Sequence, residues 1–142
     1  FPIGKTKQTH LSDFLEKKPK TIKEIKRNDI TFKEKIDLSK HNNKTIRIGT
    51  VGKGGQGERI YDPSGHAITL SAYRGGIGSK TGLYKIDDII RKLTPRECAR
   101  IQGFPENFII DTSSNQAYKQ FGNSVSINVI QHIIKNIIFS LY

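Results

Sequence analysis

The stretch Arg91–Gly103, RKLTPRECARIQG, marks the point at which the chain changes from strands and loops to helices. Thr94 is a favourable helix N-cap, and Pro95 fits the first helical position that follows it. Glu97 stands where a capping box places its acidic residue, so that its side chain can reach back to the cap. The pattern therefore predicts a helix that ends at Gly103.

Two further helices are expected between this helix and the end of the chain. Residues 113–116, SSNQ, start the first of them, and Gly122 closes it. Asn123-Ser124 is placed to cap the second, whose apolar residues fall on one broad stripe. A stripe of this width on a terminal helix needs a large surface to cover it. It comprises Val125, Val129, Ile130, Ile133, Ile134, Ile137, Ile138 and Leu141.

The region before Arg91 is typical of short strands and turns. Alternation predicts a strand over 46–51, with Ile46, Ile48 and Thr50 on one face and the remaining residues on the other. A turn is expected over 62–65, DPSG, and a short strand over 67–70. Another strand is expected over 30–38 with a break at its middle, preceded by a helical turn within 13–18.

Ten of the 13 glycines lie between Gly49 and Gly82, in two clusters over 52–57 and 75–82. The first cluster has the spacing G-x-G-x-x-G, which in a dinucleotide-binding loop stands between a strand and a helix. Residues 58–61 run directly into the expected turn and leave no room for that helix. A nucleotide cofactor is therefore not expected at this loop.

The formal net charge is +11, and a balance this basic favours a polyanionic partner such as nucleic acid. The alternative is a solvated, lysine-rich surface. One cysteine, Cys98, excludes an internal disulfide, and the four scattered histidines predict no metal site. The sequence contains no apolar run that we expect to cross a membrane. It has no methionine and begins Phe-Pro, which suggests the later part of a longer chain or a processed one.

Both glycine clusters are flanked by side chains that suit DNA. Arginine can bond both acceptors of guanine, lysine meets phosphates, and small residues let the backbone approach a groove. The clusters therefore predict two DNA-reading loops on a small β scaffold. The alternative is a pair of ordinary mobile surface loops.

Two longer stretches carry a family resemblance. Residues 91–105, RKLTPRECARIQGFP, resemble the ninth motif of bacterial DNA cytosine-5 methyltransferases, and residues 120–125, QFGNSV, resemble their tenth. Residues 44–84 are similar to the target-recognition region of one member in particular, with the shared runs VGKGGQGERIY, AITLSAY and KTG. The resemblance covers nearly all of residues 44–135.

The resemblance implies a mixed α/β architecture in three parts. Residues 1–12 would end a catalytic-domain segment, and residues 13–93 would form a small, β-rich target-recognition domain. Residues 94–142 would be helices that pack on, and complete, a Rossmann-like methyltransferase domain that binds S-adenosyl-L-methionine (AdoMet). The broad apolar stripe of the last helix would then face a sheet outside this sequence.

The family reaction flips a cytosine out of the duplex and methylates C5 from AdoMet, with a cysteine nucleophile in a Pro-Cys loop and a glutamate in Glu-Asn-Val. Neither segment, nor the Phe-x-Gly-x-Gly cofactor loop, occurs in this sequence. Cys98 lies inside a helix and is expected to be a packed thiol. The chain is therefore expected to be the recognition half of the enzyme, as a fragment or a separate subunit, and to be inactive alone. Its partners would be double-stranded DNA and an N-terminal catalytic half that binds most of the AdoMet.

The resemblance also assigns site residues. Gln56 would fill the space left by the flipped base, and Arg59 would read guanine. Asn123 and Ser124 would close one side of the AdoMet pocket. The full DNA-binding set is Arg47, Lys53, Gln56, Arg59, Thr69, Ser71, Tyr73, Gly76 and Lys80. Arg91, Arg96 and Glu97 are expected to be structural.

The implied target is GCGC, within a restriction-modification system of the bacterial cytoplasm and nucleoid. Arg74, Gly78 and Ser79 depart from the pattern and leave the outer base pairs open. Two other interpretations stand beside this one: a stand-alone, non-enzymatic DNA-binding module, and a basic protein whose loops bind RNA.

Overall fold

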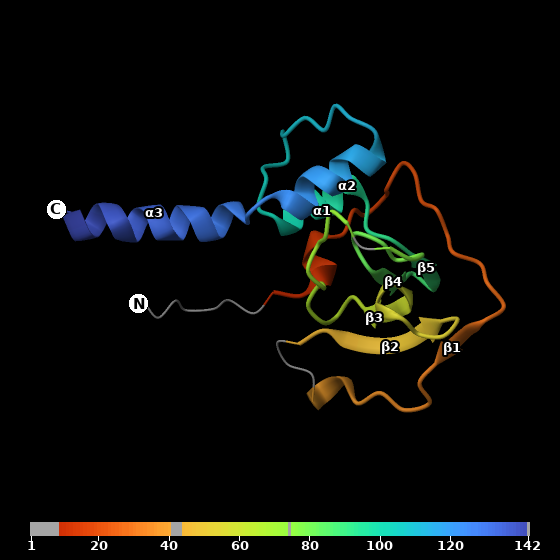
Figure 1. The fold of residues 1–142 in the computed structure, drawn as a ribbon. Coiled ribbons are helices and arrows are strands. Elements are labelled where there is room, and N and C mark those ends of the chain that lie inside the picture. The colour runs from red at the N-terminus through yellow and green to blue at the C-terminus, as the bar shows by residue number, and fades with distance from the viewer. Residues whose placement is uncertain (1–8, 41–43, 74, 142) are drawn as a thin grey trace.

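The computed structural model describes residues 9–40, 44–73 and 75–141. Within them, a five-stranded sheet lies beside two short helices, and a third helix extends away from both (Figure 1). The strands are β1 (Ile30–Phe32), β2 (Ile46–Val51), β3 (Arg59–Asp62), β4 (Leu83–Ile86) and β5 (Ile89–Arg91). The helices are α1 (Pro95–Ile101), α2 (Ser114–Asn123) and α3 (Ile127–Leu141), and short 3-10 turns cover Leu11–Phe14, Leu38–Lys40 and Gln56–Glu58. The mixed α/β fold class is as predicted.

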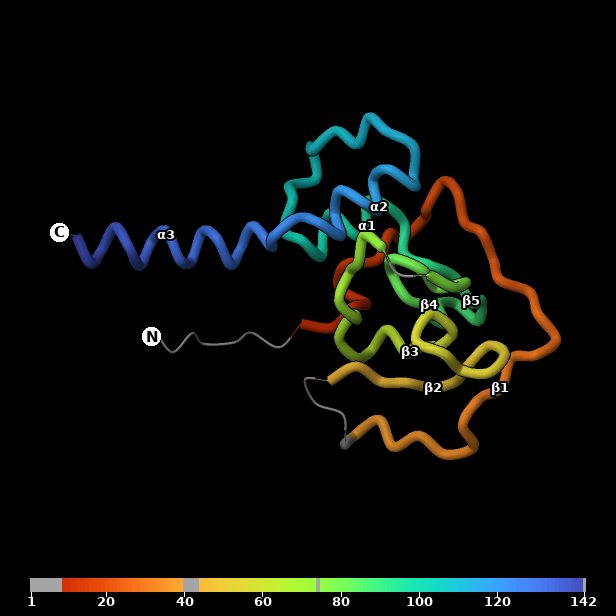
Figure 2. Tube along the Cα trace, in the orientation of Figure 1, coloured from red at the N-terminus to blue at the C-terminus, as the bar shows by residue number. Residues whose placement is uncertain are grey.

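The strands lie in the order in which the chain makes them, and only the β3–β4 pair is parallel. Residues 17–29 run around the outside of the molecule from the helices to β1 (Figure 2). On the way, the Ile25 N–H donates to the Ile90 carbonyl of β5 at 2.8 Å. The Lys85 ammonium of β4 lies 5.6 Å from the ring centre of Phe32 in β1. The sheet therefore curls until the segment that contains β1 touches strands far from it in the strand order.

A bulge in β2 changes which residues share a face. Arg47 pairs with Tyr61 and Thr50 with Arg59, with a register shift between them. Because cross-strand partners share a face, Arg47 and Thr50 lie on the same side of the sheet, three residues apart. The predicted alternation, which placed them on opposite sides, is wrong here, and Val51 is fully buried on the other face.

Each face of the sheet has its own core. On one face a cluster of aliphatic residues fills the curl of the sheet, and the other face packs against α1 and α2. The first core contains Ile46, Ile48, Val51, Ile60, Leu83 and Ile90. The second contains Leu11, Tyr61, Leu70, Tyr84, Ile86, Leu93, Cys98, Ala99, Ala117 and Phe121. The helices are thus fixed to the sheet by the second core.

Two predicted strands are shorter than expected or missing. Residues 67–70 have no regular structure, because the Ile68 N–H donates to the Tyr84 hydroxyl at 3.0 Å and finds no strand partner. The strand predicted over 30–38 ends at Phe32, where pairing with β2 stops. The turn over 62–65 is present, closed by the Gly65 N–H on the Asp62 carbonyl at 3.3 Å.

The helix ends follow the capping rules, with one shift. The Thr94 side chain accepts from the Glu97 N–H at 3.2 Å, and the Glu97 carboxylate accepts from the Thr94 N–H at 2.8 Å, so the predicted capping box is confirmed. Ser124 ends α2 instead of starting α3. The Ser126 carbonyl accepts the first bonds of α3, so the predicted cap was two residues early.

α3 contacts little of the rest of the chain, and none of its described residues is buried. By length and composition alone, the segment Ser114–Leu141 is long and apolar enough to cross a membrane, contrary to expectation. The helix breaks within it, however, between Asn123 and Ile127. The 15 residues of α3 cover only about 22 Å, against about 30 Å of bilayer hydrocarbon. The composition is therefore weak evidence for a membrane span.

Candidate nucleic-acid interface

The bulge in β2 gathers polar side chains on one face of the sheet, beside the first glycine loop. Arg47, Thr50 and Arg59 share this face. The Thr50 hydroxyl lies 2.9 Å from that of Thr31. A Cβ added at Gly54 would stand 3.0 Å from the Thr50 methyl and 3.3 Å from an Arg47 nitrogen. The loop backbone therefore lies directly on this row of side chains.

Both arginines of the row keep an unused donor. The Nε atoms of Arg47 and Arg59 are buried and have no hydrogen-bond partner within the described part of the chain. An unpaired buried donor costs about 1–3 kcal/mol. The described part of the chain therefore leaves both guanidinium groups only partly hydrogen-bonded.

The two glycine loops form one surface. The Gly78 N–H donates to the Gly57 carbonyl at 2.7 Å, and a Cβ at Gly57 would lie 2.3 Å from the Gly75 carbonyl oxygen. Gly76, at φ 88°, has the left-handed backbone that glycine tolerates best. Contact this close is possible only without side chains, so the glycines join the loops. The first loop is followed by a single 3-10 turn instead of an α-helix, as expected.

Hydrogen bonds hold the polar residues of the second loop in place. The Ser71 N–H donates to the Lys80 carbonyl at 2.9 Å. The Lys80 ammonium lies 3.5 Å from both the carbonyl and the side-chain oxygen of Asn115 on α2. Tyr73, with 84% of its surface exposed, projects from the loop between them. An exposed tyrosine on a braced loop is suited to contact a partner.

The structure brings the nine predicted DNA-binding residues to these loops and the strands beside them. Lys53, Gln56, Thr69, Tyr73 and Gly76 are exposed, whereas Arg47, Arg59, Ser71 and Lys80 are half-buried. Arg74 lies outside the described residues. Sequence reasoning missed Thr50, because the bulge hid its face, and Asn115, which lies 35 residues from Lys80 in the chain.

Gly122 joins the second loop to the helices. A Cβ there would lie 2.4 Å from the Ala72 nitrogen, so the last turn of α2 rests on the loop backbone. The Ser124 hydroxyl donates to the Phe121 carbonyl at 2.9 Å, and Gln102 of α1 donates to the same carbonyl at 2.8 Å. The two predicted cofactor residues thus directly follow the residue that contacts the second loop.

The AdoMet-binding role of Asn123 and Ser124 stays a prediction, for which their side chains offer free polar groups. Asn123 is exposed, and its side-chain amide has no hydrogen bond within the described residues. The Ser124 hydroxyl uses its proton and keeps lone pairs for a donor. The amide can therefore bind the polar groups of a cofactor, while the hydroxyl accepts from it.

A buried ion pair holds the sheet to the helices. The Arg91 guanidinium donates to both Glu97 carboxylate oxygens, at 2.9 and 2.8 Å, and these side chains are 3% and 0% exposed. The Glu16 N–H donates to the same carboxylate at 3.0 Å, and Arg100 donates to the Leu15 carbonyl at 2.9 Å. Arg96 donates to the Phe108 carbonyl at 2.7 Å. The structural roles predicted for Arg91 and Glu97 are confirmed, whereas the bond of Arg96 lies within the helical part of the chain and leaves its predicted role untested.

Cys98 is 1% exposed, in the core between α1 and the sheet. Burial raises the pKa of its thiol, and the Glu97 charge raises that pKa further. A thiol in this state is a poor nucleophile. The prediction of a packed cysteine is confirmed.

Comparison with known proteins identifies the family. Residues 2–139 match the C-5 cytosine-specific DNA methylase family. The chain belongs to this family. The type II methyltransferase M.HhaI of Haemophilus parahaemolyticus, the member that residues 44–84 resemble, is 62% identical over 98 residues, which cover 69% of this chain and 30% of M.HhaI. M.SsoII of Shigella sonnei is 36% identical over 141 residues, 99% of this chain and 35% of that enzyme. The chain thus spans about a third of the length of each relative.

Two solved structures share the fold of this chain at low sequence identity. The Entamoeba histolytica methyltransferase EhMeth has a TM-score of 0.61 at 17% identity, covering 99% of this chain and 44% of that one. The S. pombe Dnmt2 methyltransferase has a TM-score of 0.58 at 18% identity, covering 94% and 41%. Both therefore support the methyltransferase fold alone.

Proposed function

We propose that this chain is the target-recognition part of a DNA cytosine-5 methyltransferase, with residues 13–93 reading the duplex and residues 94–142 attaching them to the catalytic part. The observation that carries the proposal is the joined pair of glycine loops beside the unsatisfied donors of Arg47 and Arg59. On the resemblance of residues 44–84 to the target-recognition region of M.HhaI, we propose GCGC as the target, in a restriction-modification system of the bacterial cytoplasm and nucleoid.

The loops divide the work of recognition. Arg59 bonds the O6 and N7 acceptors of a guanine, which is the commonest specific contact in the major groove. Exposed Gln56 stands at the start of the 3-10 turn where the two loops meet, and it enters the space left by the flipped cytosine. Lys53, exposed at the tip of the first loop, binds a phosphate.

Catalysis comes from the N-terminal half of the enzyme, on the same chain or a separate one. AdoMet supplies the methyl group, and Asn123 and Ser124 close one edge of its pocket. The exposed apolar stripe of α3 packs on that half. The present chain contains neither the Pro-Cys nor the Glu-Asn-Val segment, and we therefore expect no methyl transfer by it alone.

Arg59→Ala tests the reading of guanine. We expect it to reduce discrimination at one guanine of GCGC by about 1–3 kcal/mol, measured as the affinity ratio between the intact site and a site substituted at that guanine. An equal loss on both duplexes would contradict the assigned role.

Lys53→Ala is the matched phosphate test. It should weaken binding to every sequence equally and make the salt dependence shallower by about one unit. A slope identical to that of the unmodified chain would remove Lys53 from the phosphate contacts.

Reconstitution separates an enzyme part from a stand-alone binding module. Addition of an N-terminal half with the Pro-Cys and Glu-Asn-Val segments should give AdoMet-dependent methylation of a GCGC duplex, measured by methyl incorporation. A chain that binds GCGC tightly and neither associates with such a half nor supports methylation would be a non-enzymatic module.

A further inference from the structure

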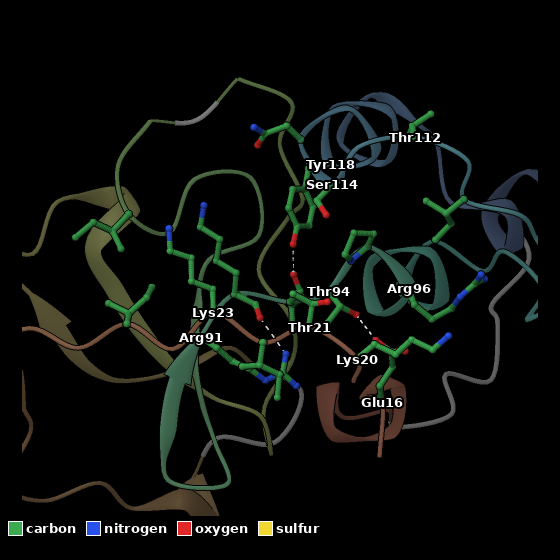
Figure 3. A pocket seen from close by; sticks show the side chains of 18 of the residues that line it. Glu16, Lys20, Thr21, Lys23, Arg91, Thr94, Arg96, Thr112, Ser114 and Tyr118 are labelled. Carbon is green, nitrogen blue, oxygen red and sulfur yellow. Dashed lines mark hydrogen bonds between the residues drawn. The ribbon is translucent and has the colours of Figure 1, made fainter. Parts of the chain in front are cut away.

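A cleft with a volume of about 1060 Å³ opens beside the second glycine loop. One wall is the segment from Glu16 to Ile25, and the opposite wall is formed by the starts of α1 and α2. Gly76 and Ile77 of the second loop line it as well. Figure 3 shows Lys20 and Lys23 on the segment and Ser114 on α2 around this space. The cleft therefore adjoins the surface that reads DNA.

The cleft is strongly basic. Among the charged residues that line the cleft, Glu16 is acidic, and the charge of Arg91 is neutralised by its ion pair with Glu97. The remaining charged lining residues are Lys18, Lys20, Lys23, Lys92 and Arg96. Among the described residues, none of these five forms an ion pair. The four lysines therefore have no ion-pair partner within this part of the chain, whereas Arg96 interacts with the charge of the Glu106 carboxylate.

The Lys92 ammonium of the cleft lies close to other positive charges. Burial lowers the pKa of Lys92, and the nearby charges of Lys80 and Lys23 lower it further. The Lys92 ammonium lies 3.0 Å from the Ser79 hydroxyl, and that of Lys80 lies 3.5 Å from Asn115 oxygens, so both ammonium groups contact neutral groups. Like charges held together without a counter-charge are stabilised by a polyanion.

We propose that this lysine cleft, residues Lys18, Lys20, Lys23 and Lys92, binds backbone phosphates of the DNA duplex outside the recognised base pairs. The proposal rests on the function proposed above. Gly76 and Ile77 of the second glycine loop line the cleft, so a duplex held by the loops passes next to the lysines. The cleft would add affinity on any flanking sequence and no base discrimination.

The test uses the chain of 142 residues and two GCGC duplexes. The shorter duplex has about 12 base pairs and covers the site. The longer duplex has about 24 base pairs, so each of its ends extends past the shorter duplex by roughly half a helical turn. Affinity is measured by fluorescence anisotropy over a salt series. The double variant Lys20→Gln/Lys23→Gln removes two exposed cleft charges. The control, Lys33→Gln/Lys35→Gln, removes two exposed charges that do not line the cleft.

On the longer duplex, Lys20→Gln/Lys23→Gln should make the salt slope shallower by about two units and leave the slope on the shorter duplex unchanged. The control should match the unmodified chain on both. Equal slopes for the cleft variant and the unmodified chain on the longer duplex, or an equal loss on both duplexes, would overturn the proposal. If the unmodified chain did not prefer GCGC over a scrambled duplex, the proposed target would fail, whereas a loss confined to the longer duplex would still support the cleft.

Discussion

Helices α1 and α3 differ in how far the rest of the chain buries them, although both belong to the C-terminal part of the chain. α1 has seven residues, and Glu97, Cys98 and Ala99 among them are buried. α3 has 15 residues, none of them buried, and its isoleucines face solvent. The residues of α1 are thus covered within this chain, whereas the apolar stripe of α3 is left uncovered by the described part of it.

The largest loss of unfolding free energy should come from a substitution in α1. Glu97→Ala leaves the Arg91 guanidinium buried without its partner, which should cost about 3–5 kcal/mol of unfolding free energy, measured by urea denaturation. Glu106→Ala, which removes the exposed partner of Arg100, is the control and should cost far less. Similar losses in the two variants would show that the buried pair does not hold the helices.

Next in size is the contact between the glycine loops. Gly57→Ala would place a Cβ 2.3 Å from a carbonyl oxygen and should destabilise the chain by about 1–3 kcal/mol while weakening GCGC binding. Gly75→Ala adds a Cβ with nothing within 4 Å and should be silent in both measurements. If the two alanine variants behaved alike, the loops would not be joined as described.

A smaller effect should appear at high pH. The thiol of Cys98 stays protonated in the folded chain because its pKa is raised, whereas in the unfolded chain it ionises near pH 8.5. The stabilisation is therefore complete below that pH and should fall by about 1.4 kcal/mol per pH unit above it. Tyr118, whose pKa burial raises to about 12, adds to the loss above about pH 10.

Denaturation at pH 7.5 and pH 10 measures this loss. In Cys98→Ala the dependence on pH over that interval should shrink, whatever the cost of the cavity. An unchanged dependence would mean that other groups cause it.

The smallest effect is expected on α3. Ile133→Asp should change the unfolding free energy of this chain by less than about 0.5 kcal/mol, because the side chain is already 52% exposed. The same change should prevent association with the N-terminal half, measured by co-elution. A strong destabilisation of the isolated chain would show that α3 packs on its own body after all.

Much of this could be predicted from local sequence, and the failures have physical causes. The capping box at Thr94, the turn at 62–65 and the packed Cys98 depend on residues close together in the chain. The face shared by Arg47 and Thr50 depends on a bulge that simple alternation cannot reveal. Residues 67–70 alternate like a strand and lack a neighbouring strand to pair with. The contact between Lys80 and Asn115 joins segments that only the folded chain brings together.

The hydrogen bonds of Glu16 and Arg100 carry a consequence for how such a protein can change over evolution. They tie the point where the chain leaves the helices, near Leu15, to the point where it returns, near Glu97. Residues 17–92 thus form a segment whose two ends are held together by these hydrogen bonds. A different segment joined at the same hydrogen bonds would keep its attachment to the helices and exchange the proposed reading surface. A new specificity would then not require new helices.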